Sequence, residues 1–324
     1  MTVTTSFLTG ISLIGSSTPA LASDGQPADV GRYTYEQDRE VLAAMAKWAP
    51  VNSSETVMGY PKGLERDKEG SVKAVTLEDV RDKLNPVEAI VQARNAARQY
   101  AQDAKNPAAL RYSARHLSDG WPNSTPPSGY EIRRNTKDDA LPSAPEMTAE
   151  QYCGMVNTNP NHWAYGQTAP CVFVGTLDEK YPVRGVSDGV TGESKLTYKV
   201  SATVWNEESV TKGWSAGGKI TPKIGDGSAG GEISGEASFT YSYAVTSATK
   251  LVNTQETAVE VNVPQGKKGY LEGRANGAYY TGYIVLRDID TNQKEHMVAI
   301  PARAYVQAPT SSSAVTWFKR LTSS

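Results

Sequence analysis

The chain has 324 residues, of which 39% are hydrophobic and 21% charged, with 33 Lys and Arg against 35 Asp and Glu. A formal net charge of -2 provides no overall positive field for polyanions, which excludes a general nucleic-acid binder. The 28 Gly and 17 Tyr against only 4 Phe favour exposed strands over a large apolar core, and the length suits about two domains.

Residues 1–22 have the features of a secretory signal peptide. They carry no charged side chain, contain the apolar stretch Phe7–Gly15 and end in Ala20-Leu21-Ala22, a small-x-small pattern that signal peptidase accepts. We expect cleavage after Ala22 and a secreted protein that is soluble as a monomer, because no later run reaches the roughly 20 apolar residues of a transmembrane helix. A buried N-terminal strand is the alternative.

Residues 23–117 are predicted to form a helical N-terminal region. Thr34 and Gln37 have the spacing of a capping box, and apolar residues then recur at helical spacing up to Pro50. Two further helices are expected to begin at Asn-Pro pairs, because Pro is favoured at the first helical position. These pairs are Asn85-Pro86 and Asn106-Pro107.

Four arginines are expected on these helices. Acidic residues lie nearby in the sequence, and a run of charge on a helix is usually its solvated face. We therefore expect these side chains to face solvent rather than to bind nucleic acid or lipid: Arg94, Arg98, Arg111 and Arg115. Residues 118–150 follow, and their content of Pro, Ser, Asn and Asp predicts a linker.

Cys153 and Cys171 are the only cysteines in the chain. In an oxidising compartment this pair predicts one disulfide, which contributes roughly 3 kcal/mol in the chain-entropy model. The loop between them contains His162, Trp163 and Tyr165, which are candidates for a receptor-binding loop. Packing of the same aromatic side chains in the interior is the alternative, since Tyr and Trp bury well.

From residue 151 to 324 the period of the hydrophobic pattern changes to two, which predicts an antiparallel β region. Apolar and polar residues alternate in 196–204 and again in 259–263. The same pattern is looser in 279–286 and 296–306. The expected fold class is therefore α+β, mainly β, with a helical N-terminal region before an elongated antiparallel β region.

Residues 214–246 predict a long amphipathic hairpin around a Gly-rich turn. Its two alternating runs, 214–224 and 233–245, are 11 and 13 residues long, whereas a soluble strand has about 5 to 6 residues and a strand that crosses lipid about 9 to 11. The face expected to contact lipid consists of Trp214, Ala216, Ile220, Ile224, Ile233, Ala237, Phe239, Tyr241, Tyr243 and Val245. The face expected to line a lumen consists of Lys219, Thr221, Lys223, Ser234, Glu236, Ser238, Thr240 and Ser242.

A hairpin of this kind can cross a membrane only as part of an assembly. The edges of an isolated ribbon would carry unpaired N–H and C=O groups into lipid, so several copies would have to close one β-barrel. The same alternation also fits a long hairpin on a secreted β-sandwich, with one face packed and one face wet. The pattern leaves both interpretations open.

The stretch from Thr203 to Leu286, roughly a quarter of the chain, resembles the aerolysin-like β-pore-forming toxins, in particular the epsilon-toxin and mosquitocidal-toxin branch. The resemblance rests on Val204-Trp205-Asn206, on the Ser/Thr-rich runs with Ser238–Tyr243, and on Val259–Pro264 before a Gly-rich strand pair. It implies an elongated monomer that binds a receptor on a target-cell membrane, forms a homo-oligomer and inserts residues 214–246 as a transmembrane β-barrel.

The resemblance also implies activation by removal of a terminal peptide. Residues 310–313, before Trp317-Phe318-Lys319-Arg320, are the candidate site; an ordinary frayed terminus is the alternative. Three features depart from the family. Pro222 lies inside the first run of the hairpin, and Pro264 stands alone where the family commonly has a pair of prolines. The N-terminal region is helical rather than a lectin-like β module.

No catalytic motif is recognisable. The histidines at 116, 162 and 296 do not have the spacing of a zinc site, and the chain contains neither Gly-x-Ser-x-Gly nor a phosphate-binding loop. The sequence therefore predicts a secreted pore-forming toxin-like protein that is not an enzyme and needs no cofactor or metal. The alternatives are a secreted β-sandwich binding module without membrane insertion and a secreted hydrolase with scattered catalytic residues.

Overall fold

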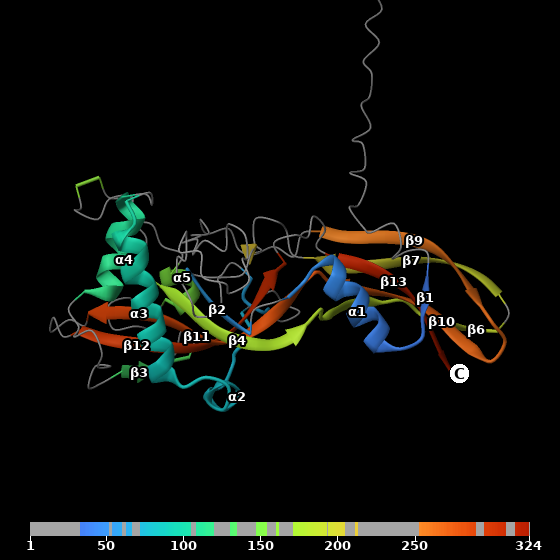
Figure 1. Cartoon of the computed structure of the whole chain (residues 1–324), viewed down its shortest axis with the longest axis horizontal. Helices are drawn as coiled ribbons and strands as arrows, with labels where there is room; N and C mark the ends of the chain where they lie inside the picture. The colour runs from blue at the N-terminus through green and yellow to red at the C-terminus, as the bar shows by residue number, and fades with distance from the viewer. Residues whose placement is uncertain are drawn as a thin grey trace, which may run out of the picture.

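The structure of the protein is a computed structural model. It describes residues 33–51, 54–59, 63–66, 72–104, 108–119, 130–134, 147–153, 160–161, 171–192, 194–204, 211–212, 253–289, 295–308 and 315–323. The fold is mixed α and β with more strand than helix, which confirms the expectation of a mainly β protein. Four helices lie toward one end of the long axis, namely α2 (Leu77–Arg81), α3 (Pro86–Gln102), α4 (Ala108–Ser118) and α5 (Ala149–Cys153) (Figure 1). α1 (Asp38–Trp48) lies apart from them beside β13 (Val315–Ser323) and β1 (Thr34–Tyr35), and strands continue toward the other end (Figure 1).

Most strands belong to two sheets. The six-stranded sheet has the order β2 (Glu55–Gly59), β4 (Val172–Lys180), β11 (Gly277–Ile289), β12 (Glu295–Gln307) and β3 (Tyr130–Ile132), with β8 (Thr211–Lys212) also beside β12. The five-stranded sheet has the order β1 (Thr34–Tyr35), β13 (Val315–Ser323), β10 (Lys267–Ala275) and β5 (Val183–Val186), with β6 (Val190–Thr191) also beside β10. A separate antiparallel pair consists of β7 (Ser194–Val204) and β9 (Asn253–Val263). The four segments predicted to be strands, residues 196–204, 259–263, 279–286 and 296–306, lie in β7, β9, β11 and β12.

Neighbouring strands pass from one sheet into the other at a common place. β4 leads into β5 through Tyr181 and Pro182, β10 leads into β11 through Asn276, and β12 is followed by Ala308 on the way to β13. Because β4, β11 and β12 are neighbours in one sheet and β5, β10 and β13 in the other, the two sheets follow one another along the molecule (Figure 1). We call Tyr181, Pro182, Asn276 and Ala308 the joint.

Both faces of the six-stranded sheet are buried. One face packs against α3 (Pro86–Gln102) and α4 (Ala108–Ser118) through Val172, Val174, Tyr283, Val285, Met297 and Ala299. The opposite face shares a buried cluster with α1 (Asp38–Trp48) and α5 (Ala149–Cys153) through Phe173, Tyr280, Ile284, Leu286, Val298 and Ile300. The expectation of exposed strands is therefore wrong for this sheet, because helices cover the face that was expected to be wet.

The helix starts expected at the two Asn-Pro pairs are confirmed. Asn85 Oδ1 accepts a hydrogen bond from the Val87 amide at 2.8 Å, and Pro86 is the first residue of α3. α4 begins at Ala108, directly after the second pair, and the short α2 (Leu77–Arg81) precedes both helices. Within the described ranges, no helix has the length and apolar character needed to cross a membrane.

The first helix begins later than predicted. Glu40 Oε2 accepts a hydrogen bond from the Gln37 amide at 3.1 Å, so the capping box starts at Gln37 and not at Thr34. Thr34 and Tyr35 instead form β1, which pairs with β13. The prediction failed at this position because a tertiary partner, which is not visible in the local pattern, holds these two residues in an extended conformation.

The N-terminal region and the Pro-rich stretch also contribute short strands that were not predicted. β2 lies between α1 and α2 in the sequence and pairs with β4, and β3 lies within residues 118–150 and pairs with β12. With three to five residues each, these strands are too short for a period of two to be recognised. They attach both segments directly to the six-stranded sheet.

Arg94 does not lie on a solvated face. Its residue is 4% exposed, and its Nη2 donates a hydrogen bond to the carbonyl oxygen of Ser118, the last residue of α4, at 3.0 Å. Burial and the neighbouring Arg98 and Arg287 lower the pKa of its guanidinium. Arg115 is exposed as expected, but at Arg94 the expectation is wrong, because this side chain caps the end of another helix.

The C-terminal strand is an interior strand. β13 forms nine residue pairs with β10 on one side and pairs with β1 on the other. Trp317, Phe318 and Arg320 are all buried. The alternative of a frayed terminus is therefore wrong, and removal of the peptide after residues 310–313 would take a buried strand out of the sheet.

Candidate membrane-insertion region

Several of the predicted site residues lie outside the described residues. These are the signal peptide (1–22), the hairpin (214–246) with all of its predicted lipid-facing and lumen-facing side chains, and the candidate receptor residues His162, Trp163 and Tyr165. The structure describes the elements that flank the hairpin in the sequence. Their geometry decides how such a hairpin would be attached to the rest of the protein.

β7 and β9 form a regular two-stranded ribbon on either side of the hairpin segment. They pair in eleven consecutive positions, from Ser194 opposite Val263 to Val204 opposite Asn253, without a bulge. Paired strands lie about 4.8 Å apart, so residues 205–252 leave the ribbon and return to it at adjacent points. The two ends of the segment, at Val204 and Asn253, are therefore held side by side, as the two strands of a hairpin require.

β8 brings the chain back to the body soon after β7 ends. Thr211 and Lys212 pair in parallel with Val306 and Gln307 of β12, immediately before Ala308 of the joint. This attachment consists of two residue pairs, whereas the ribbon has eleven. A rearrangement that extends the ribbon beyond Val204 would have to break this short pairing.

The ribbon is also fixed to the central strand of the smaller sheet. β9 turns into β10 through Pro264 and Gly266, where the Lys267 amide donates to the Pro264 carbonyl oxygen at 3.1 Å and Gly266 has a φ of 75°. Val261 and Val263 are buried, as the predicted alternation requires. Because β10 continues into β11, the ribbon connects to a strand that runs through both sheets.

Backbone hydrogen bonds hold the joint together. The Tyr181 amide donates to the Gly277 carbonyl oxygen at 2.8 Å, and the Ala308 amide donates to the Asn276 carbonyl oxygen at 2.8 Å. The buried Asn276 side chain accepts a hydrogen bond from Thr316 Oγ1 at 2.7 Å. Three strands therefore cross between the sheets at positions that are bonded to one another.

Arginine and tyrosine side chains stack beside the joint. The Arg303 guanidinium lies 3.9 Å from the centre of the Tyr279 ring, and Arg184 Nη1 donates to the Tyr279 hydroxyl at 2.8 Å. Burial would lower the pKa of Arg303, but ion pairs with Glu179, Glu65 and Asp178 raise it overall. This cluster fixes β4, β5, β11 and β12 to one another on the outside of the joint.

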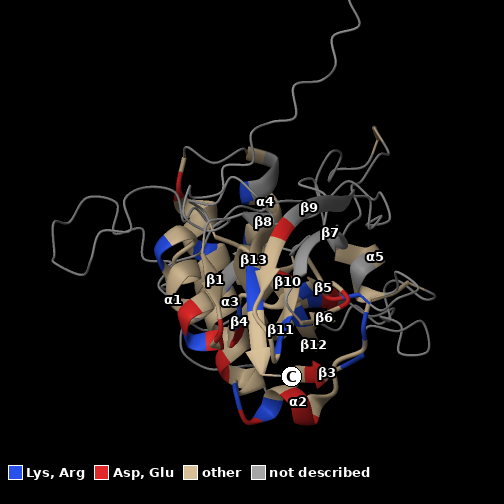
Figure 2. Ribbon diagram, turned by 90° about the vertical axis from the view of Figure 1, so that its right-hand side faces the viewer, with Lys and Arg blue, Asp and Glu red and all other residues tan. Residues whose placement is uncertain are grey.

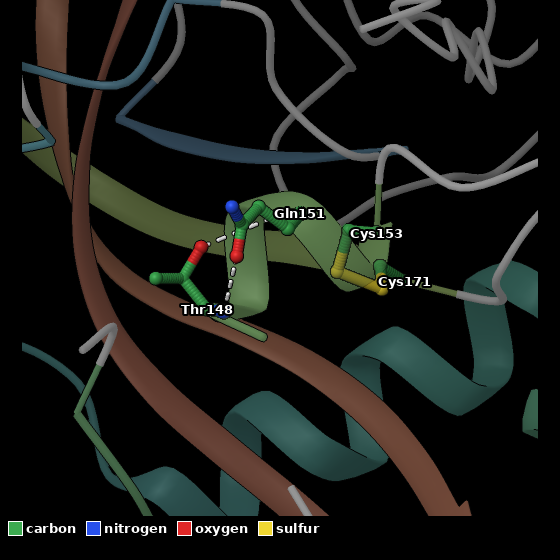
Figure 3. Close-up of a disulfide and its surroundings, with 4 residues drawn as sticks. All are labelled: Thr148, Gln151, Cys153 and Cys171. Carbon is green, nitrogen blue, oxygen red and sulfur yellow. Dashed lines mark hydrogen bonds between the residues drawn. A yellow bond between two sulfur atoms is a disulfide. The ribbon is translucent and has the colours of Figure 1, made fainter. Parts of the chain in front are cut away.

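The disulfide predicted between Cys153 and Cys171 is present, with a Cα–Cα distance of 5.7 Å (Figure 3). Both cysteines are fully buried. Thr148 and Gln151 cap α5 reciprocally, since the Thr148 amide donates to Gln151 Oε1 at 2.9 Å and the Gln151 amide donates to Thr148 Oγ1 at 3.2 Å. The disulfide fastens this helix to the beginning of β4.

The histidines do not form a common site in the described part of the chain. His296 Nδ1 lies 3.3 Å from Glu131 Oε1, and the His116 ring packs against Tyr112 with the ring centres 4.7 Å apart. In comparisons with known proteins, no protein-family model, curated protein or solved structure matches the chain.

Proposed function

We propose that the protein is a secreted pore-forming protein of the aerolysin-like type. It binds a target-cell membrane through a receptor, forms a homo-oligomer and inserts residues 214–246 of each copy as two strands of a transmembrane β-barrel. The observation that carries this proposal is the uninterrupted ribbon of β7 and β9, whose open end is the point where residues 205–252 leave and return.

The register of the ribbon supports the proposal further. If the pairing of Val204 with Asn253 continued unchanged, Trp214 would lie opposite Tyr243 and Ile224 opposite Ile233. The apolar residues of the two runs would then share one face, and the midpoint of the hairpin would fall between Ser228 and Ala229, inside the Gly-rich turn. Cross-strand partners on one face are what a lipid-facing β surface requires.

The experiment uses liposomes loaded with a fluorescent dye and a variant that fixes β8 to the body. Lys212 and Gln307 are opposite each other, so Lys212→Cys with Gln307→Cys can form a disulfide across the two strands. The wild type should release dye and form oligomers on the membrane. The oxidised double variant should bind but release little dye, and reduction should restore release.

The reduced double variant and the two single variants serve as controls for folding. Equal release from the oxidised and reduced forms would rule out the extension of the ribbon through β8 into the inserted strands. A wild type that binds its target surface but neither forms oligomers nor releases dye would favour the β-sandwich binding module.

A further inference from the structure

The segment of residues 33–49, which we call the α1 segment, crosses the region where the two sheets meet. Figure 1 shows α1 at the middle of the long axis, beside β13 and β1. The buried residues of the segment share one cluster with Phe318 of the smaller sheet and Tyr280 of the larger. These residues are Val41, Met45 and Ala49. The segment therefore packs against both sheets.

Charge fixes the N-terminal end of α1. Asp38 Oδ1 lies 2.5 Å from Arg320 Nη2 and 3.5 Å from Arg274 Nη2. Both arginines also pair with Glu272, whose Oε1 is 2.8 Å from Arg320 Nη1. Figure 2 shows acidic residues on α1 and basic residues on β13, and an outer pair of Lys267 with Glu36 adds to them at 3.1 Å.

Asp38 is the solvent-exposed partner of two buried arginine side chains. The side chains of Arg320, Arg274 and Glu272 are only 3%, 9% and 7% exposed, whereas that of Asp38 is 66% exposed. Without Asp38, two buried arginines would share one carboxylate, and a buried charge without its partner is strongly destabilising. In this charge cluster, solvent thus reaches Asp38, whereas Arg274, Arg320 and Glu272 are packed in the interior.

A hydrogen bond to the joint fixes the C-terminal end of α1. The Tyr181 hydroxyl donates to the carbonyl oxygen of Ala49 at 2.9 Å. Tyr181 has a φ of 52°, which lies in the left-handed region that residues with a side chain rarely adopt. Arg274 Nη1 donates to the Tyr181 carbonyl oxygen at 3.4 Å, so one arginine contacts both the charged end of α1 and the joint.

We propose that the α1 segment holds the joint in its described conformation and has to detach before the protein can insert. The pairing of β8 lies on Val306 and Gln307, next to Ala308 of the joint. Detachment of the α1 segment removes two restraints on the joint, the charge of Asp38 and the hydrogen bond to Ala49. The joint then rearranges and β8 leaves β12. The last of these consequences rests on the proposed function.

The first experiment measures amide hydrogen exchange in the full chain and needs no membrane. Asp38→Asn keeps the size of the side chain and removes its charge. Exchange at the amides of Tyr181, Ala275 and Ala308, which bond across the joint, should become about tenfold faster, and exchange in the middle of β11 should not change. The matched control is Glu36→Gln, which breaks only the exposed pair with Lys267. Equal exchange in the wild type and Asp38→Asn would overturn the proposal.

The second experiment locks the segment with an engineered disulfide. Thr34 and Lys319 are opposite each other in β1 and β13, so Thr34→Cys with Lys319→Cys can cross-link them. In its oxidised form this variant should bind membranes as the wild type does but release dye at least about tenfold more slowly than its reduced form. The wild type treated with the same reductant is the control, because its own disulfide is fully buried.

The two experiments separate the two proposals. Equal dye release from the oxidised and reduced lock would show that the α1 segment need not detach. A wild type without any dye release would refute the proposed pore, and the exchange experiment would then still decide whether the α1 segment holds the joint.

Discussion

Gly269 of β10 lies directly against Val263 of β9, so that a Cβ atom on Gly269 would come within 2.3 Å of Val263 Cγ2. Real Cβ contacts are not this short, and the glycine therefore allows the ribbon of β7 and β9 to approach the smaller sheet. The absence of a side chain at Gly269 thus determines how closely β7 and β9, which flank the proposed insertion hairpin, lie to the smaller sheet.

Gly269→Ala should force the ribbon away from β10. We expect a loss of about 1 to 3 kcal/mol in the free energy of unfolding, as for other additions to a packed interface. Chemical denaturation measures this loss. The double variant with Val263→Ala provides the control, because it removes the clashing methyl group. If the loss of stability in the double variant equals the sum of the losses in Gly269→Ala and Val263→Ala, the two residues do not make this contact in solution.

Asp178 should make stability depend on pH in the acidic range. Burial would raise the pKa of its carboxyl, but hydrogen bonds from Lys83 and Arg303 outweigh burial and hold the pKa below its usual value of 3.8. A carboxylate with a lowered pKa stabilises the fold above its unfolded pKa, and this contribution is lost as the pH falls through the folded pKa. Asp178→Asn should therefore be less stable than the wild type at pH 7.

The stability difference between wild type and Asp178→Asn should shrink as the pH falls below about 4. Thermal unfolding of both proteins between pH 7 and pH 3 measures it. Asp188→Asn, which changes an exposed carboxylate on the loop after β5, should show a much smaller difference at every pH. A difference for Asp178→Asn that stays constant over this range would contradict the assigned ion pairs.

Local sequence signals predicted the elements whose causes are local. The start of α3 follows from Asn85 and Pro86 alone, and the alternation in residues 259–263 follows from neighbouring side chains and their two faces. Elements that depend on distant partners were not predictable in this way. Arg94 is buried because it caps α4 at Ser118, 24 residues further along the chain. Asp38 pairs with Arg320, which is 282 residues away in the sequence.

In the candidate site, too, features with a local signal could be predicted and features that depend on distant partners could not. The disulfide was predictable because only two cysteines exist, whereas the hairpin of residues 214–246 lies outside the described residues and stays a prediction. The joint was not predictable: Tyr181, Asn276 and Ala308 come from three separate segments and share no pattern of residue types. Their arrangement depends on the pairing of strands that are distant in the sequence, and local patterns in a single sequence do not reveal this pairing.

Loss of the disulfide should destabilise the larger sheet. Replacing both Cys153 and Cys171 with Ser removes a cross-link over a sequence separation of 18 residues, which we expect to cost about 3 kcal/mol. Urea denaturation should show a lower midpoint with little change in slope. The reduced wild type is the matched control, and an unchanged midpoint in both proteins would mean that packing alone fixes α5 to β4.

Charges of the proposed lumen should control ion selectivity. Reversing Lys219, Lys223 and Glu236 changes the lumen of each copy from two positive charges and one negative charge to the opposite. Because charged groups that line a pore attract counter-ions, the reversal potential of the variant in planar bilayers should shift toward cation selectivity. Lys180→Glu, an exposed change on β4, is the control. Unchanged selectivity of the triple variant would contradict the assigned lumen face.

The register of the inserted hairpin should be that of the described ribbon. Eleven consecutive pairs without a bulge fix one relation between β7 and β9, and its continuation places Ala216 opposite Tyr241. Cysteines at these two positions should cross-link in oligomers on lipid, whereas Ala216→Cys with Tyr243→Cys should not, because that pair is displaced by two residues. Non-reducing electrophoresis after proteolysis in the Gly-rich turn separates linked from unlinked strands. Preferential cross-linking of the displaced pair would show that a bulge or a register shift lies between Val204 and the membrane.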